Sequence, residues 1–301
     1  MAPERRGPGD PGGAERDVGR DAGRADQAPG RDVEGTDRAA GWEPGDGAGR
    51  RERDAAATPP VERARRTLER LAERGPEVLM EDREPWRIGG LDPASAREAA
   101  VLILFGVLDS DDARARPESL AGAAERIGAE LDVLIVVRAG SLRQHAGQPA
   151  FPGGKLDPED ADAPDPYVEA ALREAVEETG LDRDGVEVLG KLAPVPLPVS
   201  NFMVMPVLGW WTRPTPVQAV DRGESSLVFR VPVLDLVDPG RRHSATVTRG
   251  GMTYRSPAFT APSEEGDVVI WGFTGILLDR ILDETGWALP WDASRRIPAP
   301  L

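Results

Sequence analysis

The first 60 residues of the chain contain no Leu, Ile, Phe or Tyr, and Trp42 is their only aromatic side chain. A segment of this composition cannot bury enough apolar area to offset the entropy that is lost on folding. Its 10 Arg and 13 acidic residues nearly balance, which argues against a basic arm for nucleic acid. We therefore predict a disordered tail over residues 1–60, so an ordered fold has to be built from the rest of the 301-residue chain.

After residue 60, the apolar residues follow the patterns of both helices and strands. A helical stripe over 61–75 stops at Gly75 and forms the main part of a helical lead-in that we place at 61–95. Runs of aliphatic and β-branched residues predict buried strands over 99–108, 131–138, 186–197 and 201–211. A hairpin is expected over 243–259, and a strand leading into an amphipathic helix over 267–286. Because strands outnumber helices and do not alternate with them, a mixed sheet flanked by helices is favoured.

Charge and composition limit what the chain binds. The net charge of −15 repels the phosphates of nucleic acids and anionic lipids, so neither is an expected partner. Because the chain has no cysteine, disulfides, thiolate metal sites and cysteine nucleophiles are excluded. The N-terminus has no apolar signal segment, and no stretch approaches the roughly 18 apolar residues of a membrane span. We therefore expect a cytoplasmic protein.

One predicted helix carries a group of acidic side chains. The segment Asp165–Gly180 begins with an N-cap residue and a proline and ends with a glycine, as helices do. Glu174, Glu177 and Glu178 are spaced at i, i+3 and i+4, so they share one face. The simplest interpretation is a solvated acidic face. The alternative is a metal site, because Mg²⁺ and Mn²⁺ bind carboxylate oxygens that converge from a rigid support.

The sequence REAVEETGL, residues 173–181, follows a Pro-Gly-Gly turn and resembles the signature of the Nudix hydrolases. That signature is a glycine, a spacer and then Arg-Glu-aliphatic-x-Glu-Glu-x-Gly-aliphatic. The matching positions are Arg173, Glu174, Glu177, Glu178, Gly180 and Leu181, with Ala175 in the aliphatic place. The spacer after Gly154 is about five residues longer than usual, and the acid expected within it is Asp160, Asp165 or Glu169.

The segment VVRAGSLRQHAGQPAFPGGK, residues 136–155, is similar to the motif that precedes the Nudix signature in the coenzyme A pyrophosphatase branch. The matching positions are Arg138, Leu142, Arg143, His145, Gly147, Gln148, Phe151, Pro152, Gly153 and Gly154, while Ala139 stands where serine is common. Downstream, DRGESSLVFRVPVLDL and IWGFT are also similar to segments of that branch. The resemblance covers residues 96–291.

The resemblance implies the Nudix fold, an α/β/α sandwich with a mixed β-sheet, at residues 96–291, followed by a C-terminal tail at 292–301. It implies hydrolysis of a pyrophosphate bond in coenzyme A or its thioesters, giving 3′,5′-ADP and 4′-phosphopantetheine or its acyl form. The implied cofactor is Mg²⁺ or Mn²⁺. The expected partner is a small-molecule nucleotide, and the sequence leaves a homodimer open.

The resemblance also implies the residues of the site. The metal ligands would be Glu174 and Glu178, completed by Glu177 and the carbonyl of Gly154, with Arg173 orienting the glutamates. The general base is left open between Glu177, Glu174 and Glu224. The substrate would be bound by Arg138, Arg143, His145 and Gln148, since arginine matches phosphate oxygens with paired donors.

Two other functions remain. A different Nudix activity, on ADP-ribose, NADH or a nucleoside triphosphate, would keep the acidic helix and change the loops that recognise the substrate. A Nudix fold without catalysis could instead act as a ligand sensor. The complete set of glutamates argues against a sensor, because a sensor is free to lose one of them.

Overall fold

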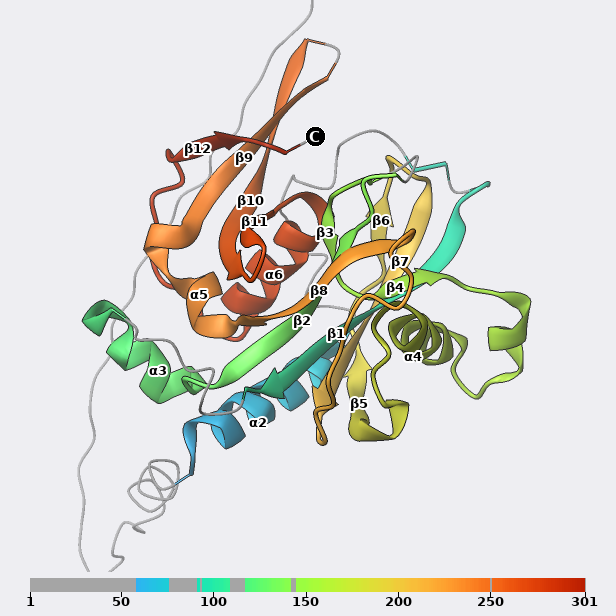
Figure 1. Ribbon diagram of the computed structural model, residues 1–301, viewed down its shortest axis with the longest axis horizontal. Coiled ribbons are helices and arrows are strands. Elements are labelled where there is room, and N and C mark those ends of the chain that lie inside the picture. The colour runs from blue at the N-terminus through green and yellow to red at the C-terminus, as the bar shows by residue number, and fades with distance from the viewer. Residues whose placement is uncertain are drawn as a thin grey trace, which may run out of the picture. The chain divides into compact units, whose positions relative to one another are not determined.

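The computed structural model describes residues 58–75, 91–92, 94–108, 117–141, 145–249 and 251–300 (Figure 1). All of these belong to one compact unit, which spans 47–301. Residues 1–57 of the disordered tail that we predict at 1–60 lie outside the described residues.

The first described element is helix α2, Pro60–Arg74, which confirms the helix predicted over 61–75. Pro60 stands in the first turn, where its missing N–H costs no helical hydrogen bond. Gly75 ends the helix with a φ of 57°, a conformation that suits glycine. Ala64, Leu68 and Leu71 form the buried stripe that holds α2 against the sheet.

The main sheet has eight strands, ordered β3-β2-β1-β7-β5, with β4 paired to β1, β6 to β7 and β8 to β2. Its strands are β1 Arg97–Val107, β2 Leu131–Arg138, β3 Pro149–Ala150, β4 Gly153–Lys155, β5 Val186–Lys191, β6 Val195–Leu197, β7 Phe202–Trp211 and β8 Ser225–Pro232. The sheet is mixed, as predicted, because β1 runs parallel to β7 and antiparallel to β2. The strand predicted over 186–197 forms two strands, β5 and β6, which both pair with β7.

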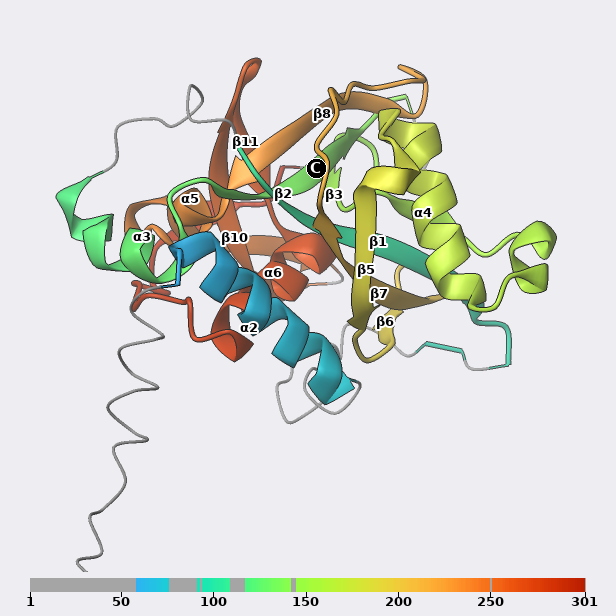
Figure 2. The same cartoon turned by 90° about the horizontal axis from the view of Figure 1, so that it is seen from below.

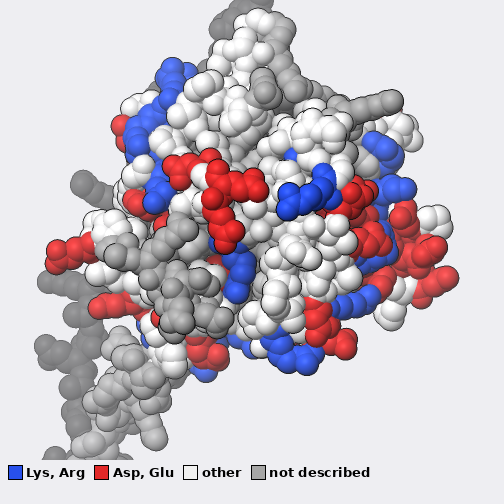
Figure 3. Space-filling view, in the orientation of Figure 1, with Lys and Arg blue, Asp and Glu red and all other residues white. Residues whose placement is uncertain are grey.

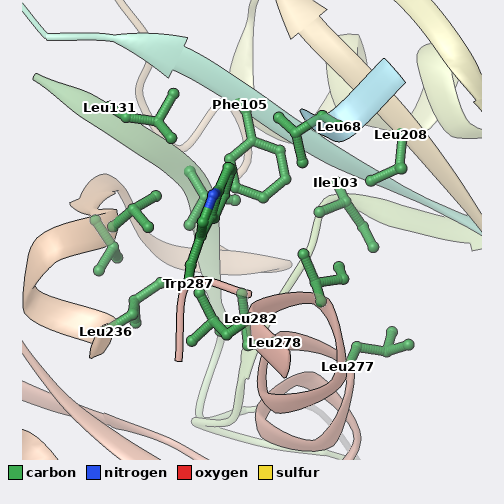
Figure 4. Packing of buried hydrophobic residues seen from close by; sticks show 14 of the residues in the cluster. Leu68, Ile103, Phe105, Leu131, Leu208, Leu236, Leu277, Leu278, Leu282 and Trp287 are labelled. Atoms are coloured by element: carbon green, nitrogen blue, oxygen red, sulfur yellow. The ribbon is translucent and has the colours of Figure 1, made fainter. Parts of the chain in front are cut away.

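Alternate residues of β1 face two separate cores. Leu102 and Leu104 belong to the core under helix α4, Pro166–Thr179, whereas Ile103 and Phe105 belong to the core on the other face. That second core includes α2 and helix α6, Gly272–Glu284. In Figure 4, Phe105 and Trp287 lie beside each other in this core, and their rings meet edge to face with centroids 6.2 Å apart. Helices therefore cover both faces of the sheet, as the predicted sandwich requires (Figure 2).

A second sheet, which the sequence did not lead us to expect, adds to the core on the α2 and α6 side. Its order is β11-β10-β9-β12, with β9 Arg242–Arg249, β10 Met252–Ser263, β11 Gly266–Ile270 and β12 Arg296–Pro298. Strands β9 and β10 confirm the hairpin predicted over 243–259, and β11 followed by α6 confirms the strand and helix predicted over 267–286. Strand β12 lies within the predicted C-terminal tail and pairs with β9 in parallel. The predicted domain boundaries otherwise stay predictions.

Short helices complete the described part of the chain. They are α3 Ala121–Ile127 and α5 Val233–Val237, with 3₁₀ turns η4 Glu118–Leu120, η5 Pro158–Asp162, η6 Arg183–Gly185 and η7 Pro239–Arg241. In Figure 3, acidic side chains are dense at the right, where Figure 1 shows the segment that precedes α4. None of the described helices is both long enough and apolar enough to cross a membrane.

Candidate metal and substrate site

Helix α4 supports the predicted acidic residues, and its ends are those that the sequence indicates. Asp165 caps the helix by accepting hydrogen bonds from the N–H groups of Tyr167 and Val168, at 3.2 and 3.3 Å. Gly180 ends the helix with a φ of 70°, and its N–H donates to the carbonyl of Val176 at 2.8 Å. The buried face of α4 is rich in alanine, so the helix packs closely on the sheet.

Strand β4 lies against α4, and its two glycines allow the contact. The N–H of Gly153 donates to Oε2 of Glu178 at 3.1 Å. Gly153 has a φ of 156°, and a Cβ at this position would stand 2.3 Å from the carbonyl oxygen of Ala100. A Cβ at Gly154 would stand only 2.3 Å from Oε1 of Glu174. The carboxylate of Glu174 therefore occupies space that only a glycine at position 154 leaves free.

The three glutamates of α4 differ sharply in exposure. The side chain of Glu178 is 6% exposed and that of Glu174 is 18% exposed, whereas that of Glu177 is 58% exposed. A solvated acidic face is thus the wrong description for Glu174 and Glu178, which turn toward β4. Glu177, in contrast, does face the solvent, and its role in metal binding stays a prediction.

Arg173 connects the acidic side chains around it. Its guanidinium donates to both oxygens of Asp160 at 3.1 Å, to Oε1 of Glu174 at 3.0 Å and to Oε2 of Glu177 at 3.3 Å. The hydrogen bonds that Arg173 donates to Asp160, which are the largest cause, and to Glu174 raise the pKa of Arg173. An arginine that bonds three carboxylates can orient them, as the resemblance implies.

The three candidates for the acidic residue of the spacer have different partners in the structure. Asp160 is buried and its carboxylate accepts both hydrogen bonds from Arg173, which keep its pKa below the usual value. Asp165 instead caps α4, and Glu169 pairs with Arg183. Among the three candidates in this spacer, only Asp160 contacts the arginine next to the predicted ligands.

Glu178 lies in the most unusual electrostatic environment of the site. Its pKa is raised to about 7, chiefly because burial disfavours the charged carboxylate. The N–H of Gly153 and the charge of Arg138, whose Nη1 lies 3.8 Å from Oε1, lower the pKa, while the charges of Glu174 and Glu224 raise it. The predicted base candidate Glu224 is therefore close enough to repel Glu178.

The predicted substrate-binding residues gather at the ends of β2 and β3. Arg138 is the last residue of β2, and its N–H donates to the carbonyl of Gln148 at 3.1 Å. The Oε1 atom of Gln148 lies 2.8 Å from Nδ1 of His145. Arg138 links this group to the acidic helix, because its Nη1 lies 3.8 Å from Oε1 of Glu178. The fourth residue, Arg143, lies outside the described residues, so its role stays a prediction.

The site fits a hard divalent cation only in part. The buried carboxylate of Glu178 is repelled by the charges of Glu174 and Glu224, and the Nη1 atom of Arg138 lies 3.8 Å from it. A divalent cation would neutralise this negative charge. Glu178 and Glu174 therefore suit this role. Over the described ranges, however, no three His, Asp or Glu side chains are already grouped to hold a metal ion. Arg173 donates hydrogen bonds to oxygens of Glu174 and Glu177, which are the same side chains that we predict to be metal ligands.

Ser225 is a neighbour of Arg138 that the sequence did not indicate. It is fully buried and stands opposite Arg138 in the pairing of β2 with β8. The sequence pointed to its neighbour Glu224 and gave no reason to notice a serine. Only the pairing register of β2 with β8 could have shown it, and the two strands are distant in sequence.

The chain was also compared with known proteins. The model of the NUDIX domain family matches residues 121–249. An uncharacterized Nudix hydrolase, NudL of Yersinia enterocolitica, is 34% identical over 158 residues, which cover 52% of this chain and 74% of that protein. NudL of Yersinia pestis is 35% identical over 155 residues, which cover 52% of this chain and 73% of that protein.

Solved structures that match are more distant. The Nudix hydrolase RenU of M. smegmatis is 22% identical with a TM-score of 0.32, over 46% of this chain and 71% of that one. A MutT/nudix family protein of Enterococcus faecalis is 15% identical with a TM-score of 0.35, over 62% of each chain. The two NudL proteins carry the assignment, since this chain covers more than two thirds of each at over 30% identity. The chain belongs to the Nudix hydrolase family.

Proposed function

We propose that this Nudix hydrolase cleaves the pyrophosphate bond of coenzyme A or its thioesters, giving 3′,5′-ADP and 4′-phosphopantetheine or its acyl form. The observation that supports the proposal most is the position of the upstream motif. Arg138 belongs to the motif that resembles the coenzyme A branch, and it lies 3.8 Å from the buried Glu178 of the Nudix signature. Residues that match a substrate motif thus adjoin residues that match a catalytic one.

Nudix hydrolases generally use divalent metal ions. In this chain Glu174 and Glu178, with Glu177 and the Gly154 carbonyl as further donors, would hold Mg²⁺ or Mn²⁺. Such an ion neutralises charge on a diphosphate and lowers the pKa of water. Arg173 keeps the carboxylates oriented through the contacts that it makes with Asp160 and Glu174. Arg138, Arg143, His145 and Gln148 bind the phosphates of the substrate.

For the general base, we favour Glu224 over Glu174 and Glu177. Both helix glutamates accept hydrogen bonds from Arg173, so carboxylate oxygens that a base would need are already engaged. Glu224 is exposed, and its charge is felt at Glu178. Its backbone is fixed by the N–H of Ala139, which donates to its carbonyl at 2.8 Å.

Comparing Glu224→Gln with Glu177→Gln tests this assignment. A positioned general base contributes on the order of 100-fold or more to a rate, so Glu224→Gln should lower kcat by about that factor. Glu177→Gln should lower kcat by about tenfold or less, because its exposed side chain retains an oxygen for Arg173. Steady-state kinetics on both variants checks the prediction, and a reversed order of the two losses would assign the base to Glu177.

Replacing Gly154 with alanine should displace Glu174 and lower kcat about 100-fold. The added Cβ would lie 2.3–2.6 Å from the atoms of that carboxylate, so the carboxylate must move away from β4. Overpacking of this kind costs typically about 1–3 kcal/mol of stability. Gly140→Ala is the matched control, because a Cβ there meets nothing within 4 Å. Kinetics and melting temperature of both variants check the prediction, and wild-type kcat in Gly154→Ala contradicts it.

Mass analysis of the products tests the proposed function itself. After incubation of the protein with coenzyme A and Mg²⁺ or Mn²⁺, we expect the masses of 3′,5′-ADP and 4′-phosphopantetheine. Parallel reactions with ADP-ribose, NADH and nucleoside triphosphates separate this activity from other Nudix activities. Tight binding of a nucleotide without turnover of any of them would instead indicate a ligand sensor.

A further inference from the structure

The motif IWGFT, residues 270–274, resembles a segment of the coenzyme A branch, yet the site described above gives it no role. It joins strand β11 to helix α6, and Thr274 stands in the first turn of that helix. The side chain of Thr274 is only 4% exposed, and its hydroxyl donates to the carbonyl of Pro149 at 2.9 Å. The motif therefore contacts the residue that directly follows Gln148.

The carbonyl that Thr274 holds faces away from β2. The N–H of Arg138 donates to the carbonyl of Gln148, and successive carbonyls of a strand point in opposite directions. The carbonyl of the next residue, Pro149, therefore cannot bond to β2. Because Pro149 is buried, its carbonyl needs a donor from elsewhere in the protein, and Thr274 supplies that donor.

The first turn of α6 is fixed against the second sheet. The N–H of Gly272 donates to Oγ of Ser256 at 3.3 Å. Gly275 lies so close to β10 that a Cβ at this position would stand 2.5 Å from the carbonyl oxygen of Pro257. Since the backbone is held on both sides of Thr274, its hydroxyl has a defined position from which it can hold Pro149.

Residues 145–148, which we call the substrate loop, end at Pro149 and contain a strained residue. His145 has a φ of 58°, a left-handed conformation that persists only where the surrounding structure holds it. Two short backbone bonds shape the loop. The N–H of Gly147 donates to the carbonyl of Arg138 at 3.0 Å, and that of Gln148 donates to the carbonyl of His145 at 3.1 Å. A loop of this kind depends on what fixes its ends.

We propose that Thr274 is a positioning residue for substrate binding, which acts on the substrate loop through Pro149. This inference rests on the proposed function, in which His145 and Gln148 bind the phosphates of the substrate. With Pro149 fixed, Oε1 of Gln148 keeps its place 2.8 Å from Nδ1 of His145. A loop that is already ordered in this way loses less conformational freedom when the substrate binds.

Thr274→Val tests the proposal, because it replaces the hydroxyl with a methyl group of similar size. The KM for coenzyme A should rise about tenfold, as the loss of one hydrogen bond predicts, whereas kcat should stay within about twofold. Thr274→Ser keeps the hydroxyl and should return the KM to within about twofold of the wild type. Thr274→Ala loses the same hydroxyl in a smaller side chain, and it replaces Thr274→Val if the valine variant does not fold.

Thr285→Val is the matched control at the other end of α6. The hydroxyl of Thr285 donates to the carbonyl of Ile281 at 2.7 Å, so this variant also loses a hydrogen bond to a backbone carbonyl. Both valine variants should lower the melting temperature, but only Thr274→Val should raise the KM. An equal KM in the two variants would show that Thr274 only stabilises the fold.

Hydrogen exchange of backbone amides examines the substrate loop without any substrate. The N–H groups of Gly147 and Gln148 are both hydrogen-bonded, so their exchange reports opening of the loop. In Thr274→Val these amides should exchange about tenfold faster than in the wild type, because one hydrogen bond that holds the loop is lost. In Thr274→Ser and Thr285→Val their exchange should stay within about twofold of the wild type.

The outcomes differ for the two proposals. Faster exchange in the substrate loop of Thr274→Val, together with no cleavage of coenzyme A by the wild-type protein, would support the role of Thr274 in fixing the loop and refute the proposed function. Exchange in Thr274→Val within twofold of the wild type would overturn the inference whether or not coenzyme A is cleaved. An unchanged KM in Thr274→Val, where the wild type cleaves coenzyme A, would overturn it as well.

Discussion

Replacing Glu178 with glutamine should lower kcat about a thousandfold while the fold stays intact. The substitution keeps the volume of the side chain and an oxygen for the N–H of Gly153, which lies 3.1 Å from Oε2 in the wild type. It removes the negative charge that a hard cation needs. Metal-assisted charge stabilisation is worth several kcal/mol, and each 1.36 kcal/mol corresponds to about a tenfold change in rate.

The same variant should be more stable than the wild type, whereas its kcat is lower. Burial raises the pKa of Glu178 from 4.5 to about 7, so the folded state holds a proton that the unfolded state releases between these values. Without added metal, the wild-type protein should therefore lose stability as the pH rises from about 4.5 to about 7. Glu178→Gln lacks this loss, and its melting temperature should exceed that of the wild type most clearly above pH 7.

Glu177→Gln provides the control for the effect on stability. Its side chain is 58% exposed, so it should change neither the melting temperature nor its pH dependence. A Glu178→Gln protein that hydrolyses its substrate within about threefold of the wild-type rate would show that Glu178 is not a metal ligand. A lower melting temperature above pH 7 would show that the buried charge stabilises the fold.

The local patterns of the sequence predicted the elements of the site well. Asp165, Pro166 and Gly180 determine where α4 begins and ends, because caps act within one turn of the helix. The strands predicted over 131–138 and 201–211 are rich in apolar residues, which many sheet arrangements can bury.

Partners distant in sequence could not be predicted in this way. The spacing of the glutamates shows that they share a helix face, but not that Glu178 packs on Gly153 while Glu177 faces water. Those environments depend on β4, which reaches its place by pairing with β1. The second sheet escaped prediction for the same reason, since β12 joins it only through tertiary pairing with β9. Ser225 next to Arg138 is a further example, because strand register is a long-range property.

Removing divalent cations with EDTA should abolish turnover, and Mn²⁺ or Mg²⁺ should restore it. The buried Glu178 faces the charges of Glu174 and Glu224, and without a cation these carboxylates repel an anionic diphosphate. Undiminished hydrolysis in excess EDTA would refute the metal-dependent mechanism.

Binding of the cation should also be measurable without substrate. An ion that binds only the folded state at 100 times its dissociation constant stabilises that state by about 2.7 kcal/mol. For a domain of this size, that corresponds to a rise in melting temperature of roughly 5–10 °C. Glu178→Gln should lose most of this rise, whereas Gly140→Ala should keep all of it, because a Cβ at position 140 meets nothing within 4 Å. An equal rise in the wild type and in Glu178→Gln would place the cation elsewhere on the protein.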